Sequence, residues 1–147
     1  MAISAKLECN MEECPAFLVL VATPPGIMSS ALRTFLGTMA GVKVVAYAAA
    51  CQIELLTLLE GIRPNLLLFD ADLAVYKSDG YARPLPDLFR QLHCAYPEMP
   101  IILLANDLKQ KNLALEAGVH EVILKGALDV RLRQAILRLI PPYAETE

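Results

Sequence analysis

The sequence predicts a single doubly wound α/β domain, with five parallel β-strands and helices on both faces of the sheet. Three observations predict this fold. Short apolar runs of strand length alternate five times with longer segments whose apolar residues recur at helical spacing. The runs are continuously apolar, which is typical of strands buried on both faces. The chain has 147 residues, of which 56% are hydrophobic, enough for one core and too few for two ordinary domains.

The elements follow in order from these apolar patterns and from their stop signals. Strands are expected at residues 17–21, 42–47, 66–69, 101–104 and 121–124. Helices are expected at residues 27–39, 50–60, 86–95, 107–117 and 128–140. Gly41, Gly61 and Gly118 follow the first, second and fourth helices, and Pro141-Pro142 ends the fifth.

The first half of the chain shows how each element is recognised. The first strand is apolar at every position and stops at Thr23-Pro-Pro-Gly26. Helical spacing predicts that the first helix buries Ile27, Ala31, Leu32, Phe35 and Leu36. The same spacing predicts that the second helix buries Ile53, Leu56 and either Leu58 or Leu59.

In the second half, the third strand runs directly into Asp70, and a polar loop containing residues 77–80 follows it. Pro97 and Pro100 bracket the turn before the fourth strand. Asp107 is expected to cap the helix that follows that strand. The last helix repeats leucine and isoleucine at helical spacing, so most of them are expected in the core, with Leu137 and Ile140 left over for a partner.

Parallel strands joined by right-handed crossovers predict the flavodoxin-like strand order 2-1-3-4-5. Function in such sheets lies at the carboxyl ends of the strands, here at Thr23, Asp70, Ala105 and Lys125. The predicted organisation is a flexible N-terminal arm at residues 1–15, the folded domain at 16–141 and a C-terminal tail at 142–147.

Composition argues against several classes of function. The net charge is −3 and no dense Lys/Arg stripe occurs, so direct nucleic-acid binding is not expected. No apolar run is long enough to span a bilayer and no export signal is visible, so a cytoplasmic protein without membrane contact is expected. Four cysteines without a C-x-x-C pair, and two histidines, do not indicate a zinc site. Cys51 and Cys94 are expected to be buried thiols, and His120 is expected at the surface.

Three stretches together resemble the receiver domain of two-component response regulators, the CheY-like domains. They are Gly41-Val-Lys-Val-Val-Ala-Tyr-Ala48, Arg63-Pro-Asn-Leu-Leu-Leu-Phe-Asp70 and Ala117-Gly-Val-His-Glu-Val-Ile-Leu-Lys-Gly126. The resemblance covers about residues 16 to 140. It implies that Asp70 matches the phospho-acceptor and that Lys125 matches the active-site lysine.

Receiver chemistry, as the resemblance implies it, needs more than these two residues. Acids after the first strand and the acceptor aspartate hold Mg²⁺, which neutralises the transferred phosphoryl group. A Thr or Ser after the fourth strand then binds the phosphate, and an aromatic residue on the fifth strand follows it inward. Here the acid pair falls on Thr23 and Pro24, the hydroxyl position on Ala105 and the aromatic position on Val122.

These departures predict an atypical receiver, or pseudo-receiver, for which Mg²⁺ is not expected as a cofactor. We therefore expect a stand-alone module of signal transduction that regulates or binds another signalling protein without phosphorylation. The stand-alone character is expected because the chain ends seven residues after Ile140. We expect no enzyme activity beyond residual autophosphorylation on Asp70, and homodimerisation stays open.

Three alternatives remain open at this stage. Asp70 could still accept a phosphoryl group, weakly, from a histidine kinase or a small phosphodonor, or it could simply pair with Lys125. Asp72 could replace a lost metal ligand, because strand alternation aims it in the same direction as Asp70. A flavodoxin-like binder of a small molecule is the third alternative, although no Gly-rich phosphate loop supports it.

Overall fold

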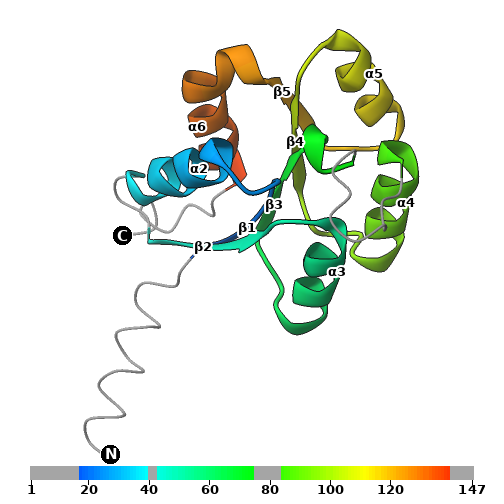
Figure 1. The fold of residues 1–147 in the computed structure, drawn as a ribbon, viewed down its shortest axis with the longest axis horizontal. Helices are drawn as coiled ribbons and strands as arrows, with labels where there is room; N and C mark the ends of the chain where they lie inside the picture. The colour runs from blue at the N-terminus through cyan, green and yellow to red at the C-terminus, as the bar shows by residue number, and fades with distance from the viewer. Residues whose placement is uncertain (1–16, 40–42, 75–83, 140–147) are drawn as a thin grey trace, which may run out of the picture.

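The predicted sheet and its strand order are confirmed. The computed structural model describes residues 17–39, 43–74 and 84–139, without the side chains of 74 and 127–129. Within these residues the strands form one parallel sheet in the order β2-β1-β3-β4-β5 (Figure 1). The strands are β1 (Phe17–Ala22), β2 (Val44–Ala49), β3 (Leu66–Asp70), β4 (Ile101–Ala105) and β5 (Glu121–Leu124).

Helices cover both faces of this sheet. They are α2 (Ile27–Gly37), α3 (Gln52–Gly61), α4 (Leu85–Ala95), α5 (Leu108–Glu116) and α6 (Leu128–Leu139). α2 and α6 pack on one face, and α3, α4 and α5 pack on the other (Figure 1). Two short 3₁₀ turns, Ala71–Ala74 and Lys125–Ala127, follow β3 and β5.

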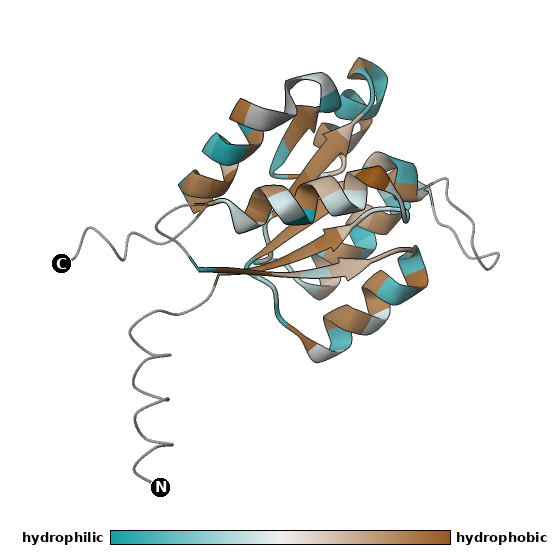
Figure 2. Cartoon of the chain, turned by 60° about the vertical axis from the view of Figure 1, so that its left-hand side comes forward, coloured by the Kyte–Doolittle hydropathy of each residue, from teal (hydrophilic) through white to brown (hydrophobic). Residues whose placement is uncertain are grey.

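The central strands are buried on both faces, as their continuous apolar runs predict. β3 and β4 are buried at every position, and Figure 2 shows the strands as an almost unbroken hydrophobic layer. Alternate residues of one strand enter different core clusters, because successive side chains point to opposite faces. Leu20 contributes to the cluster under α3, α4 and α5, whereas Val19 and Val21 contribute to the cluster under α2 and α6.

The second strand is displaced from its predicted position. It extends to Ala49, in register with Ala22 of β1, whereas the sequence predicts an end at Tyr47. Alanine favours helices over strands, but the ladder with β1 continues through Ala48 and Ala49. Pairing with the neighbouring strand therefore overrides the helix preference of alanine.

The predicted buried faces of two helices are partly wrong. Ile27 is 87% exposed, because it is the first residue of α2 and the helix is anchored further along by Leu32 and Leu36. Ala31 is exposed as well, against the prediction. Ile53 is also exposed, because α3 is rotated so that Leu55 and Leu59 face the sheet, together with Gln52.

The two cysteine predictions have different outcomes. Cys51 is buried, as expected, whereas Cys94 is exposed and the prediction of burial is wrong. The reason is the orientation of α4, which buries Leu85, Leu88, Phe89 and Leu92 and turns Cys94 outward.

Several predictions fall on residues outside the described ranges. They concern the N-terminal arm, the loop at 77–80, Gly41 and the C-terminal tail with Ile140 and Pro141-Pro142. Within the described part of the chain, no helix combines the length and the apolar character that crossing a membrane requires.

Candidate functional site

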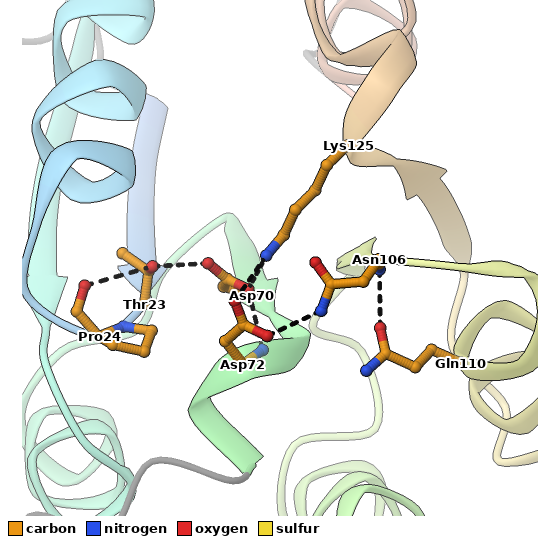
Figure 3. A network of polar contacts seen from close by, with 7 residues as sticks. All are labelled: Thr23, Pro24, Asp70, Asp72, Asn106, Gln110 and Lys125. Atoms are coloured by element: carbon orange, nitrogen blue, oxygen red, sulfur yellow. Dashed lines mark hydrogen bonds and ion pairs between the residues drawn. The ribbon is translucent and has the colours of Figure 1, made fainter.

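Four strands bring polar side chains together at one edge of the sheet (Figure 3). Thr23 directly follows β1, Asp70 ends β3, Asn106 follows β4 and Lys125 follows β5. Asp72 joins them from the 3₁₀ turn after β3. Because all strands are parallel, their carboxyl ends lie at the same edge, which explains how residues so far apart in sequence meet here.

Asp70 is the buried centre of the site, with 2% of its surface exposed. Lys125 Nζ lies 2.7 Å from Oδ1, so the predicted Asp70–Lys125 ion pair is present. The same oxygen accepts a hydrogen bond of 2.9 Å from the backbone N–H of Asp72. The other oxygen, Oδ2, accepts a hydrogen bond of 2.8 Å from the hydroxyl of Thr23. Both carboxylate oxygens are therefore held by groups of the protein itself.

Thr23 is as deeply buried as Asp70. Its backbone N–H donates to the carbonyl oxygen of Ala49, at 3.0 Å, which fixes the residue beyond the end of β1. Its hydroxyl oxygen also lies 3.5 Å from the carbonyl oxygen of Pro24. A hydroxyl has one proton to donate, and the much shorter contact with Asp70 uses it. Pro24, partly buried, brings no polar side-chain atom to the site.

Asp72 lies beside Asp70, but a 3₁₀ turn places it there and not the strand alternation that the sequence suggested, because β3 ends at Asp70. Its side chain is about half exposed, at 48%. Its Oδ2 is 3.0 Å from Lys125 Nζ, and its Oδ1 accepts a hydrogen bond of 2.7 Å from Asn106 Nδ2. Lys125 therefore bridges two carboxylates from above the sheet edge (Figure 3).

Two opposing effects act on the pKa of Asp72 and of Lys125. Partial burial raises the pKa of Asp72, but the hydrogen bonds from Asn106 and Lys125 and the charge of Lys125 outweigh it, so the net pKa lies below 3.8. Burial lowers the pKa of Lys125, but its hydrogen bonds and charge interactions with Asp70 and Asp72 outweigh it, so the net pKa lies above 10.5. Both groups are charged near neutral pH.

Sequence reasoning did not identify Asn106 and Gln110. The side-chain amide of Asn106 reaches Asp72, and its backbone N–H donates to Gln110 Oε1 of α5, at 2.7 Å. Asp107 caps α5 as predicted, because its Oδ1 accepts a hydrogen bond of 2.9 Å from the backbone N–H of Gln110. The signal that could have indicated these two residues is a polar residue directly after the fourth apolar run, followed by a glutamine one helical turn later.

No family model and no curated protein matches the sequence. Solved structures that match it include the RcsB response regulator of Salmonella typhimurium, with a TM-score of 0.70 at 19% identity. The match covers 89% of this chain but only 66% of the RcsB chain, less than two thirds of its length.

Two further matches cover nearly the whole of the other chain. A CheY-like response regulator receiver domain protein from Methanospirillum hungatei JF-1 has a TM-score of 0.65 at 22% identity, with 88% of this chain and 98% of that chain covered. The receiver domain of the sensor histidine kinase PA1611 from Pseudomonas aeruginosa PAO1 has a TM-score of 0.68 at 17% identity, with coverages of 84% and 97%. This chain has the receiver fold.

Within the receiver fold, apolar side chains fill the position expected for a Thr or Ser after β4 and the position expected for an aromatic residue on β5. Ala105 ends β4 and is fully buried, and Val122 of β5 is buried with 7% exposure. Both belong to the core cluster under α3, α4 and α5. Ala105 supplies no hydroxyl group and Val122 supplies no ring that could rotate.

The side chains at this site present no free set of ligands for Mg²⁺, because hydrogen bonds and ion pairs within the protein engage all four carboxylate oxygens of Asp70 and Asp72. Mg²⁺ requires near-octahedral oxygen ligands, usually with one or two carboxylates. Thr23 directs its proton donor at Asp70, and the ammonium group of Lys125 occupies the space between the two carboxylates. Among the described residues, no group of three or more His, Cys, Asp or Glu side chains could hold a metal ion.

Proposed function

We propose that this chain acts in signal transduction as a protein-interaction or regulatory module that works without phosphorylation. The observation that carries the proposal is the state of Asp70, whose two carboxylate oxygens are both engaged by Thr23, Lys125 and the Asp72 backbone. These contacts hold the carboxylate as part of the fold. Its partner in this proposal is another signalling protein of the cytoplasm, and neither nucleic acid nor a membrane is involved.

The charges at the site support this proposal. Phosphoryl transfer depends on positioning and on neutralising the charge of the phosphoryl oxygens. Asp70, Asp72 and Lys125 carry two negative charges and one positive charge, and the lysine already pairs with both acids. An incoming phosphoryl group would therefore meet the half-exposed carboxylate of Asp72 and no free cationic partner among these three side chains.

A weakly phosphorylatable receiver is the second candidate function. The observation that favours it is the retained contact of Asp70 with Lys125 at the end of β3. In this case Asp70 would accept a phosphoryl group from a histidine kinase or a small phosphodonor. One experiment separates the two candidate functions.

The experiment is an NMR titration of ¹⁵N-labelled protein with Mg²⁺ and then with beryllofluoride, a mimic of the phosphoryl group. We expect no saturable shifts of the Asp70, Thr23 and Lys125 amides. The positive control is the receiver domain of PA1611, whose structure has a magnesium ion coordinated in the active site cleft. Saturable shifts that spread from Asp70 into α5 and α6 would support the second candidate and refute the first.

A matched variant tests whether the missing acid is the cause. Thr23→Asp places a carboxylate where the hydroxyl now touches Asp70, and two buried like charges disfavour each other unless a cation binds between them. We expect this variant to be less stable than the wild type and to recover about 1 kcal/mol or more in millimolar Mg²⁺. The midpoint of wild-type thermal unfolding should not respond to Mg²⁺. A wild-type response equal to that of the variant would contradict this explanation.

Contact with a partner protein, or with a second copy of this chain, requires an accessible surface. Large apolar side chains are exposed on α2, α5 and α6, among them Ile27, Leu108, Val130 and Leu137. Such side chains are available for contact with a partner or a second copy of the chain. Sedimentation equilibrium over a range of concentrations distinguishes a homodimer from a monomer.

A further inference from the structure

Asp72 connects the strand-end site to α5 through a continuous series of contacts. Its carboxylate receives Lys125 Nζ at 3.0 Å and Asn106 Nδ2 at 2.7 Å. Asn106 in turn donates its backbone N–H to the side chain of Gln110, in the first turn of α5. Figure 3 shows these side chains in one chain from the end of β5, across the 3₁₀ turn, to the helix.

We propose that the Asp72 carboxylate, an anion that the chain itself supplies, fixes the position of α5. No added phosphoryl group is then needed to hold this helix. We name its contacts with Lys125 and Asn106 the Asp72 bridge. The inference rests on the proposed function, because it explains how a module that is not phosphorylated keeps one conformation at this site. Asp72 is a positioning residue in this inference.

The geometry explains why Asp72, and not Asp70, has this role. Asp70 is buried and its oxygens are engaged by β1, β5 and its own turn. Asp72 is half exposed, and its carboxylate is the group that reaches the connection between β4 and α5. The hydrogen bond from its backbone N–H to Asp70 Oδ1 holds the turn that presents this carboxylate. We therefore expect removal of the Asp72 side chain to leave the core intact and to release only the bridge.

The charges make the bridge strong for a surface contact. A charge-assisted hydrogen bond is roughly twice as strong as one between neutral groups. The Asp72 bridge contains two such bonds, one to the ammonium group of Lys125 and one to the amide of Asn106. The ammonium group cannot move away from Asp72 freely, because Asp70 also holds it at 2.7 Å.

The helix that the bridge positions carries exposed apolar side chains. α5 exposes Leu108, Leu113 and Leu115, between polar residues such as Lys109 and Asn112. A shift of the Asn106 connection would move these leucines together with the start of the helix. The Asp72 bridge thus determines where these three leucines lie relative to the sheet.

The test compares Asp72→Ala with the wild type by NMR chemical shifts and amide hydrogen exchange. We expect shifts throughout Leu108–Glu116 and roughly five- to tenfold faster exchange of the Asn106 amide, as the loss of a stabilising hydrogen-bond network implies. The amides of α3 should stay close to those of the wild type, and the midpoint of urea unfolding should fall only slightly, because the Asp72 side chain is half exposed. A residue that contributes only to overall stability would lower the midpoint and leave α5 no more affected than α3.

Asp87→Ala is the matched control. It removes a carboxylate that also pairs with a basic side chain, Arg90 at 3.0 Å, but lies on the exposed surface of α4. Its effects should be confined to α4. Asn106→Ala should reproduce the α5 shifts of Asp72→Ala, and the double variant should add little to either one, because the two residues share one contact.

The inference is overturned if α5 keeps its wild-type shifts and the Asn106 amide exchanges within twofold of the wild type in Asp72→Ala. Should that variant fail to fold, Asp72→Asn keeps the shape of the side chain, removes the charge opposite Lys125, and must show the same α5 shifts. The beryllofluoride titration is a separate result. Binding of beryllofluoride would refute the proposed function, whereas unmoved α5 amides would refute the Asp72 bridge.

Discussion

At the scale of single residues, the hydroxyl of Thr23 has a defined energetic role. It donates to a carboxylate oxygen that is buried with it. Thr23→Val keeps the shape but leaves Oδ2 of Asp70 without this donor, so we expect the free energy of unfolding to fall by about 1–3 kcal/mol. Urea denaturation measures the change. Thr57→Val, on the exposed surface of α3, is the control and should stay within about 0.5 kcal/mol of the wild type.

Lys125 is the second residue whose removal has a defined cost. Lys125→Met leaves the carboxylate of Asp70 buried without its cation, so we expect a loss of about 3–5 kcal/mol in the free energy of unfolding. Adding Asp70→Asn should recover part of this loss, because no buried charge then remains. The exposed Lys109→Met is the control. A loss below about 1 kcal/mol for Lys125→Met would show that solvent reaches Asp70 and replaces the lysine.

At the scale of elements, α5 depends on its N-cap. The carboxylate of Asp107 accepts a hydrogen bond from the backbone N–H of Gln110, a donor that has no partner within the helix. Asp107→Ala should lower the free energy of unfolding by about 1 kcal/mol. Glu116→Ala removes the same charge at the other end of α5 and should be neutral or slightly stabilising, since an acid is unfavourable there. Equal losses in both variants would indicate a general charge effect and exclude capping.

At the scale of the whole molecule, the pKa shifts predict how stability depends on pH. The pKa of Asp72 is lowered in the folded protein. Its contribution to the free energy of unfolding is therefore fully present above pH 3.8, the ordinary pKa of the group, and disappears as the pH falls through the folded pKa. The pKa of Lys125 is raised in the folded protein. Its contribution to the free energy of unfolding is therefore present below pH 10.5, the ordinary pKa of the group, and disappears as the pH rises through the folded pKa.

Urea denaturation across pH checks both signs. The stability difference between the wild type and Asp72→Asn should shrink below pH 3.8. The difference between the wild type and Lys125→Met should shrink above pH 10.5. A difference that stays constant through the acidic range would mean that Asp72 titrates alike in the folded and unfolded chain.

The sequence alone determined the architecture and the core of the site. Five continuous apolar runs separated by helical segments admit few topologies, because crossovers between parallel strands are right-handed. Asp70 and Lys125 each stand at the carboxyl end of a strand, and parallel strands place those ends at one edge. Position places both residues at this edge, and the resemblance to receiver domains indicated that they act together.

The side chains that meet around that pair follow from the folded backbone and not from the sequence pattern. The hydrogen bond of Thr23 to Asp70, and the Asn106 contact with Asp72, depend on the path of the backbone after each strand and on side-chain rotamers. The outward positions of Ile53 and Cys94 depend on the rotation of each helix against the sheet. Apolar periodicity predicts the buried face of a helix only to within about one residue position, because several neighbouring faces of a largely apolar helix can pack against the sheet.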